Sequence, residues 1–209
     1  AIVDGGNFDW AAHADKFPGL TQPDPSYHNL VYADTFGNGG AFITKATVQL
    51  MRDLGSIQSP QNAFYLNLGL ESLHVRMAQH CKNGQAVAEA LANNPKVAHV
   101  SYPGLPGDKY YELAQKYLPN GSCGVITVDV AGGREAAEKF LGNLKVFSIA
   151  THVADARSCC LHPASSTHRQ LTDEELVAAG ITPGTVRLSC GIEGTEDLIN
   201  DVEQALAAL

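Results

Sequence analysis

The segment Thr185-Val186-Arg187-Leu188-Ser189-Cys190-Gly191-Ile192-Glu193 decides the fold, because its period predicts a strand with one polar face. Apolar residues at positions 186, 188 and 190 alternate with Arg187 and Ser189, and Gly191 ends the run. Arginine presents a planar fork of donors that fits a carboxylate with two hydrogen bonds. A fixed Arg187 therefore predicts an anchor for an acidic small molecule, although spacing alone favours a surface cation on an edge strand.

The composition indicates an ordinary globular protein. The chain has 209 residues, of which 44% are hydrophobic and 17% charged, enough for one large or two small domains with a sizeable core. The net charge of -8 argues against a general nucleic-acid or anionic-membrane surface. No apolar run reaches about 18 residues, and no basic leader precedes an apolar stretch, so neither a transmembrane helix nor a signal peptide is predicted.

The cysteines and the first residues indicate the compartment and the completeness of the chain. An odd number of cysteines at irregular spacing predicts reduced thiols and a cytoplasmic protein. The five are Cys81, Cys123, Cys159, Cys160 and Cys190. The chain begins at Ala1 without methionine, and residues 2–6 read as a strand end that runs into a turn. We therefore expect a start in mid-fold, as in a piece of a longer protein.

The first part of the chain is rich in turn formers. Residues 1–40 contain many Gly, Pro, Asn and Asp residues, which predicts an extended connection that packs on another surface. The Gly37-Asn38-Gly39-Gly40 run could cradle a phosphate, but a turn is the favoured interpretation. From Ala41 to Leu54 the apolar residues recur on one helical face, and Gly55 follows as the expected C-terminal stop.

A long helix is predicted from Ser59-Pro60, where an N-cap residue precedes a proline at the first helical position. Its apolar period continues to Leu91, and Asn93-Asn94-Pro95 ends it. Such a helix of about thirty residues would span ~50 Å. Because helices of that length usually bridge two bodies, we place a domain boundary between residues 58 and 59.

After Pro95 the apolar period changes repeatedly between that of a strand and that of a helix. Strands are expected at 97–102, 123–130, 145–150, 158–161 and 186–190, and helices at 109–117, 135–141, 172–180 and 195–209. This alternation predicts an α/β or α+β fold, in which helices cover a sheet. The long bridging helix leads into it.

Two further clusters suggest chemistry. A metal site could be drawn from Cys159, Cys160, His162 and His168. Adjacent residues of a strand point to opposite faces, so the two thiols cannot bind one ion without distortion, and no metal site is predicted. Residues 162–168 place three hydroxyls and two imidazoles in a tight loop at a strand end. This loop could bind a ligand or bond to itself, and both alternatives stay open.

Five segments, taken in order, resemble a known family. They are Ser59–Phe64, Gly69–Met77, Tyr102–Leu105, His162–His168 and Val186–Glu193. Together they resemble the Cys/Met-metabolism family of pyridoxal-phosphate enzymes, and within it the O-acetylhomoserine sulfhydrylase subfamily. The resemblance implies the C-terminal part of a fold-type I transferase. Residues 1–58 would be the remnant of its cofactor-binding large domain, and residues 59–209 the bridging helix and an α+β small domain.

The resemblance also implies an activity. O-acetylhomoserine sulfhydrylase makes homocysteine in methionine biosynthesis by γ-replacement, in which pyridoxal 5'-phosphate acts as electron sink, acetate leaves, and sulfide adds. Methionine γ-lyase and cystathionine γ-synthase are alternatives within the family. A non-catalytic oligomerisation or ligand-binding module is an alternative of another class. The implied partners are the amino-acid substrate and sulfide, and the implied assembly is a homotetramer.

The resemblance assigns substrate-binding roles, but no catalytic or cofactor-binding residue, to this chain. Arg187 matches the arginine that binds the substrate carboxylate. His152 and Ser158 match the family's active-site loop. His152 stands where asparagine is common, Ala154 stands where glycine is common, and the role of Ser158, whether substrate contact or strand capping, is open. The Schiff-base lysine would precede Ala1, so these residues alone are predicted to be inactive.

Overall fold

The computed structural model describes all residues from 1 to 209, in two compact units. Unit 1 comprises Ala1–Asn67 and unit 2 comprises Leu68–Leu209. The predicted boundary between residues 58 and 59 lies inside unit 1, because most of α4 (Pro60–Glu71) groups with the residues that precede it. The assignment of these parts to a large-domain remnant and a small domain stays a prediction.

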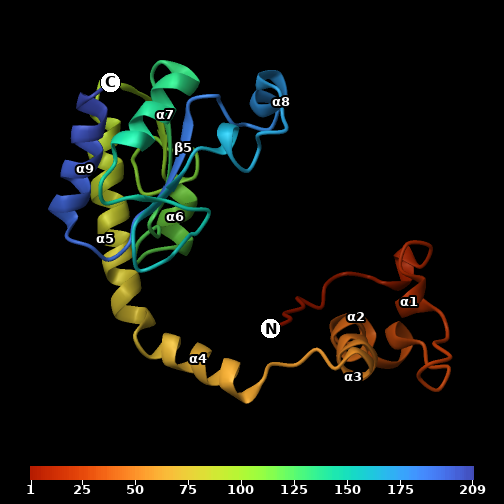
Figure 1. Cartoon of the computed structure of the whole chain (residues 1–209). Coiled ribbons are helices and arrows are strands. Elements are labelled where there is room, and N and C mark those ends of the chain that lie inside the picture. The colour runs from red at the N-terminus through yellow and green to blue at the C-terminus, as the bar shows by residue number, and fades with distance from the viewer. The chain divides into compact units, whose positions relative to one another are not determined.

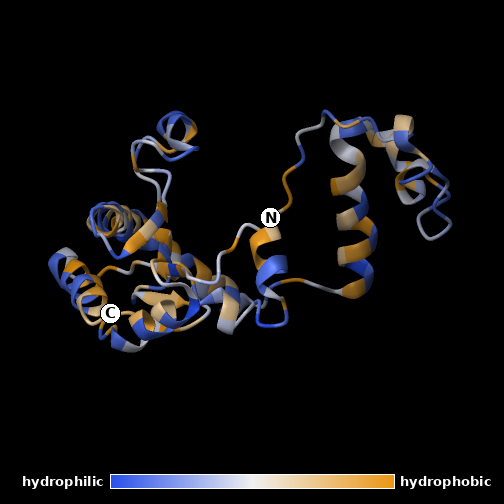
Figure 2. Cartoon of the chain, turned by 90° about the horizontal axis from the view of Figure 1, so that it is seen from above, coloured by the Kyte–Doolittle hydropathy of each residue, from blue (hydrophilic) through white to orange (hydrophobic).

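Unit 1 contains more helix than the sequence predicts. Its elements are η1 (Ala11–His13), α1 (Pro18–Thr21), α2 (Tyr32–Lys45), η2 (Ala46–Met51), wound as a π-helix, and α3 (Arg52–Leu54). The predicted extended connection over residues 1–40 is therefore wrong in part. Helix α2 starts at Tyr32 and is interrupted at Gly37, whose φ of 64° is non-helical. Gly55 ends the run with a φ of 65°, as predicted. Figure 2 shows this long helix to the right of the N-terminal label, with polar and apolar bands.

A small buried cluster holds unit 1 together. Leu20, Tyr32 and Ala41 are its buried members. The ammonium group of Lys45 lies 4.8 Å from the centre of the Tyr32 ring and 2.8 Å from Oδ2 of Asp24. The hydrogen bond from Lys45 holds the pKa of the Asp24 carboxyl well below its usual range. The ion pair and the stacked cation thus fasten α2 to the loop before it.

The predicted continuous bridging helix is wrong, because two helices replace it. α4 (Pro60–Glu71) ends before Ser72, whose φ of -106° and ψ of 5° are not helical, and α5 (Leu73–Ala92) follows. Serine competes for backbone hydrogen bonds, and Gly69 nearby weakens the helix further. The Arg76 guanidinium donates to the Ser72 hydroxyl and to the Gly69 carbonyl. These bonds satisfy acceptors that the interruption leaves free.

Unit 2 is built on a five-stranded mixed sheet. Its strands are β1 (Val97–Ser101), β2 (Val125–Val130), β3 (Ser148–Ile149), β4 (Cys159–Leu161) and β5 (Thr185–Ser189). The spatial order is β1-β2-β5-β4-β3, and only the pair β3–β4 is parallel. All five lie where the alternation of apolar residues predicted strands. The sequence-predicted α/β class is confirmed.

Helices cover one face of this sheet. α5, α7 (Gly133–Asn143) and α9 (Thr195–Ala207) pack against it, with α5 and α9 side by side (Figure 1). α6 (Tyr111–Tyr117), η3 (Pro163–Ser165) and α8 (Asp173–Ala178) complete the unit. Thr172 and Glu175 form the predicted capping box of α8. The fully buried core includes Val87, Leu91, Ile126, Val128, Phe140, Val186, Leu188, Leu198 and Val202. No helix in the structure is both long and apolar enough to cross a membrane.

Candidate functional site

Strand β5 carries the predicted anchor on the face of the sheet that points away from the core. Val186 and Leu188 are buried in the core, whereas Arg187 between them is half-buried. Arg187 pairs with Thr127 of β2 and with Leu161 of β4. The alternation read from the sequence thus places the guanidinium on the open face, on a strand with neighbours on both sides. It is not a cation on an edge strand.

A loop of nine residues, Ala150 to Ser158, lies over this end of β5, and we call it the site loop. Nη2 of Arg187 donates to the carbonyls of Thr151 and His152, at 3.2 and 3.4 Å. The hydroxyl of Ser189 accepts from the Ala154 amide at 3.0 Å. Two of the three outward-facing polar residues of β5, Arg187 and Ser189, therefore bond to the backbone of the site loop. These contacts restrict the rotation of the guanidinium.

The same alternation continues beyond the strand. The Gly191 amide donates to the Ser158 hydroxyl at 2.7 Å. The Glu193 carboxylate accepts from the Ser158 amide at 2.6 Å and from its hydroxyl at 2.8 Å. Every second residue from Arg187 to Glu193 thus bonds to the site loop. Gly191 has no room for a side chain, because an added Cβ would lie 2.4 Å from the Ala156 carbonyl oxygen and 2.6 Å from the Ser158 amide.

The three predicted substrate-binding residues lie in one region, but they present different groups. Arg187 presents its guanidinium to the open face. His152 is exposed, and the group that it presents to Arg187 is its backbone carbonyl. Ser158 is fully buried, with its hydroxyl bonded to Gly191 and Glu193. The substrate contacts of all three stay predictions, and the burial of Ser158 favours its strand-capping alternative.

Sequence reasoning missed Ser189 and Glu193 as members of the site. Both lie in the quoted strand segment, but no role was assigned to either. Alternate residues of an extended segment face the same way, so Ser189 and Glu193, two and six residues after Arg187, could have been expected on the same side as Arg187. The contacts that they make could not, because their partners are an amide of Ala154 and the buried Ser158.

Ala154 adopts a backbone conformation that favours glycine, with a φ of 58°. An alanine side chain at such a φ costs the folded state about 1 kcal/mol, and glycine removes this cost. Part of the resulting stabilisation is offset because glycine has more conformational freedom in the unfolded chain. Ala154→Gly is therefore expected to stabilise the protein by about 0.5 kcal/mol and to raise its Tm by about 1–2 °C. Thermal denaturation checks this.

The matched control is Ala156→Gly in the same loop, where the backbone does not adopt a positive φ. Glycine only adds freedom to the unfolded chain there, so this variant is expected to be less stable than the parent. Equal or reversed effects of the two substitutions would contradict the strain assigned to Ala154.

The cysteine and histidine clusters form no metal site. Cys160 lies in the core, while Cys159 faces the site loop and donates to the His152 carbonyl, so the adjacent thiols point to opposite faces, as predicted. Burial raises the pKa of the Cys159 thiol, although the positive charge of Arg187 acts in the opposite direction. No group of three or more His, Cys, Asp or Glu side chains could hold a metal ion.

Residues 162–168 are bonded to themselves and to their neighbours. The ring nitrogens of His162 contact the Ser165 hydroxyl and the Pro183 carbonyl, each at 2.8 Å. The Ser166 hydroxyl donates to the His162 carbonyl, and Thr167 bonds to the ring of His168. Of the two alternatives left open by the sequence, the structure favours the self-bonded turn.

Two hollows lie on the open face. The smaller, about 70 Å³, is lined by residues of the site loop, with Ser148 and Cys159. The larger, about 470 Å³, is lined by polar residues of β1, β2 and β5, including Thr127 beside Arg187. The smaller one is far below the few hundred Å³ that a ligand pocket usually needs. Arg187 lines neither hollow, so the chain does not enclose its guanidinium in a pocket.

These residues do not fit pyridoxal phosphate. No lysine lines the smaller hollow or bonds to the site loop. Lys109 lines the larger hollow, but it is exposed and its ammonium lies over the Tyr110 ring. Lys45 is paired with Asp24, and Lys96 donates to the last carbonyls of α9. No lysine of the chain is thus enclosed beside Arg187.

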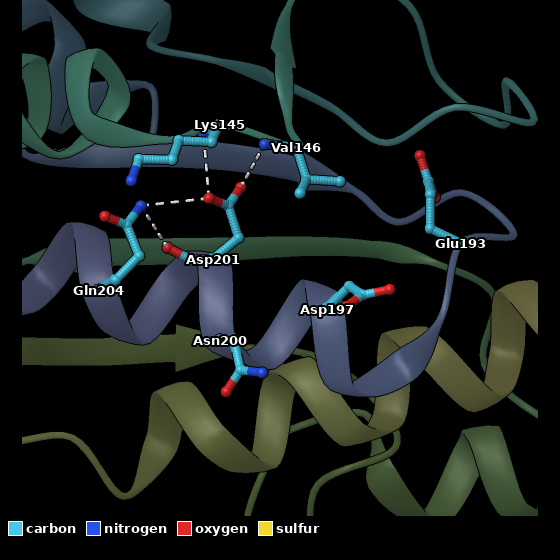
Figure 3. Close-up of a pocket in the computed structure, with 7 residues that line it drawn as sticks. All are labelled: Lys145, Val146, Glu193, Asp197, Asn200, Asp201 and Gln204. Atoms are coloured by element: carbon cyan, nitrogen blue, oxygen red, sulfur yellow. Dashed lines mark hydrogen bonds between the residues drawn. The ribbon is translucent and has the colours of Figure 1, made fainter.

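A third hollow, about 320 Å³, lies along α9 and is lined by residues of that helix together with Lys145, Val146 and Glu193 (Figure 3). Its buried member is Asp201, whose carboxylate accepts the amides of Lys145, Val146 and Phe147. These three residues lead directly into β3 and the site loop. Asp201 therefore fixes the start of the segment whose other end is held by Glu193.

The fold agrees with a family assignment. The family model of the Cys/Met metabolism PLP-dependent enzymes matches residues 28–207, so the chain belongs to this family. It is 47% identical to the O-acetyl-L-homoserine sulfhydrylase of Leptospira meyeri, over 98% of this chain and 48% of that protein. It is 44% identical to O-acetyl-L-homoserine sulfhydrylase 1 of Thermus thermophilus, over 99% of this chain and 48% of that protein.

A solved structure shows the same fold. The crystal structure of a Campylobacter jejuni protein assigned as an O-acetylhomoserine (thiol)-lyase matches with a TM-score of 0.79 and 38% identity. The match covers 92% of this chain and 45% of that one, which carries N'-pyridoxyl-lysine-5'-monophosphate. The chain thus spans about half the length of the curated relatives it matches.

Proposed function

We propose that the full-length protein is a pyridoxal-phosphate-dependent O-acetylhomoserine sulfhydrylase, and that this chain supplies the wall that binds the substrate carboxylate. The observation that carries the proposal is how the Arg187 guanidinium is held. Its Nη2 group is held by two carbonyls of the site loop. All hydrogen bonds of the guanidinium come from this nitrogen, so the Nε and Nη1 groups are free. They lie at opposite edges of the guanidinium, and a carboxylate can accept a charge-assisted hydrogen bond from either of them. The names of the relatives support the substrate.

The chain's own contribution is binding and orientation. A carboxylate that pairs with a guanidinium of fixed position is restricted in where it lies, so the carbon next to it is presented from a limited range of directions. In this family the cofactor supplies the electron sink for chemistry at that carbon. No lysine lines the hollow beside the site loop, so we expect the lysine that binds the cofactor to lie on polypeptide outside these 209 residues.

The reaction is tested on the full-length protein. With O-acetylhomoserine and sulfide, the proposal expects homocysteine and acetate in equal amounts. A methionine γ-lyase would instead release ammonia and a 2-oxo acid, and a cystathionine γ-synthase would require cysteine as the thiol. Release of ammonia and a 2-oxo acid in place of homocysteine, or a requirement for cysteine in place of sulfide, would contradict the proposed activity.

The 209 residues alone are expected to be inactive. When they are mixed with pyridoxal phosphate, we expect no turnover and no visible absorbance band of a lysine-bound cofactor, because no lysine is enclosed near Arg187. The full-length protein prepared in the same way is the control and should show both. Turnover by the 209 residues alone would contradict this expectation.

The assembly and the compartment of the full-length protein belong to the same proposal. Helix α4 buries none of its residues. Its large apolar side chains at Phe64, Tyr65, Leu66, Leu68 and Leu70 are all more than half exposed, which supports a further surface that covers them, as in a homo-oligomer. Five free thiols support a cytoplasmic location. Size-exclusion chromatography with light scattering tests the assembly.

A further inference from the structure

Arg187 donates only to backbone carbonyls of the site loop, so its orientation depends on where that loop lies. The carbonyls are those of Thr151 and His152, and both residues are exposed. Side chains of exposed loop residues cannot fix a backbone by packing. Within the loop, the His152 carbonyl also accepts from the Cys159 thiol, and the Ala154 amide donates to Ser189. The rest of the constraint on the two carbonyls comes from the ends of the segment that carries them.

Both ends of that segment are held by carboxylates from one short stretch of chain. Asp201 accepts three consecutive amides at residues 145–147, before β3. Glu193 accepts the amide and the hydroxyl of Ser158, at the point where the site loop enters β4. Figure 3 shows Glu193 separated from Asp201, on the chain that leads into α9. The residues between the two attachments include Thr151 and His152.

Both carboxylate oxygens of Glu193 are used in hydrogen bonds within the protein, which indicates a structural role. Its two oxygens bond to the two polar groups of one residue, and that residue is fully buried. The Ser158 hydroxyl also accepts from the Gly191 amide, and the Ile192 amide donates to the Ala156 carbonyl. Charge-assisted hydrogen bonds of this kind are stronger than neutral ones. The site loop is thus tied to the end of β5 four to six residues after Arg187.

We propose that Glu193 is a positioning residue, which holds Ser158 and thereby fixes the site-loop carbonyls that orient the Arg187 guanidinium. This inference rests on the proposed role of Arg187 in substrate binding. Glu193 itself touches neither substrate nor cofactor. Its effect on the reaction is transmitted through the loop backbone, so it should affect the binding of the substrate carboxylate and not the later chemistry.

The test uses full-length holoenzyme with Glu193→Gln. The amide of glutamine keeps one acceptor oxygen, so one of the two bonds to Ser158 is lost while the shape is preserved. We expect the KM for O-acetylhomoserine to rise about 10-fold, because a small displacement of a binding group is costly, while kcat stays within about 2-fold. Hydrogen exchange should become faster at the amides of Ala154 and Ser158. The control is Glu203→Gln, an exposed carboxylate on α9, which should change none of these quantities.

A second variant guards against a folding defect. Ser158→Ala removes both hydroxyl bonds but keeps the amide bond to Glu193, and it should show the same selective rise in KM. The double variant should be no worse than the more damaging single one, because both act through one contact. An unchanged KM together with unchanged loop exchange in either variant would overturn the inference. Failure of the Arg187 anchor itself would show separately, as an unchanged KM when Arg187 is replaced.

Discussion

Replacing Arg187 by leucine in the full-length enzyme is expected to lower kcat/KM for O-acetylhomoserine by about 100-fold or more. The loss of the charged partner of a carboxylate costs about 3 kcal/mol or more, which corresponds to that factor. Most of the loss should appear in KM, because the guanidinium contacts the carboxylate before and during the reaction. Steady-state kinetics at saturating sulfide measures both constants.

The control for this substitution is Arg157→Leu, in the same loop. The Arg157 side chain is 84% exposed and only approaches Asp155, at 3.7 Å, so its loss should leave kcat/KM within about 2-fold. Equal effects at the two positions would mean that net charge near the site matters, and not the fixed guanidinium of Arg187. The binding role assigned to β5 would then be wrong.

Asp201→Ala is expected to produce the largest loss of stability, about 3–4 kcal/mol in the free energy of unfolding of unit 2. The Asp201 carboxylate is 4% exposed and accepts three backbone amides, at 2.8, 2.8 and 3.1 Å. Alanine leaves these donors without their partner in a largely buried place, and each such donor costs about 1–3 kcal/mol. Urea denaturation followed by circular dichroism measures the change.

Two further variants sharpen the measurement at this position. Asp201→Asn keeps the acceptor at Oδ1 and replaces the one at Oδ2, which serves Val146 and Phe147, so its loss of stability should be intermediate. Glu203→Ala, at an exposed position of the same helix, should change the free energy of unfolding by less than about 0.5 kcal/mol. A small effect of Asp201→Ala would mean that these amides find other partners.

The central strands β2 and β5 could be predicted from the sequence because their apolar residues alternate toward the buried core. Alternation at Val125–Val130 and at Thr185–Ser189 is a direct consequence of a sheet with helices on one side only. The capping box at Thr172 was predictable for the same kind of reason, since its two hydrogen bonds depend only on local spacing. Local patterns with one physical cause were therefore read correctly.

The interruption at Ser72 could not be predicted. The apolar period continues across it, and the helix propensities of serine and glycine are too weak to force a break. What completes the interruption is the Arg76 guanidinium, which takes up the Ser72 hydroxyl and the Gly69 carbonyl. The start of α2 at Tyr32 was missed because Gly37 interrupts the helix. The glycine-rich run at residues 37–40 was interpreted as part of an extended connection.

The place of Arg187 on the open face of β5 was predictable from the sequence, and its surroundings were not. An arginine on the polar face of a strand suggests a carboxylate, and the resemblance directed attention to the site loop. The groups that hold Arg187 are carbonyls of Thr151 and His152, and every residue has a carbonyl, so side-chain identity gave no signal. The role of Ser158 depended on burial, which the sequence does not reveal for a single serine.

The most direct test of the account compares O-acetylhomoserine with its carboxamide, in which the carboxylate is replaced by a neutral group of the same shape. The ratio of kcat/KM for acid over amide is measured in the full-length parent enzyme and in Arg187→Leu. The account predicts a preference for the acid of about 100-fold in the parent and a ratio near 1 in the variant. An equal preference in both enzymes would contradict the claim that Arg187 binds the substrate carboxylate.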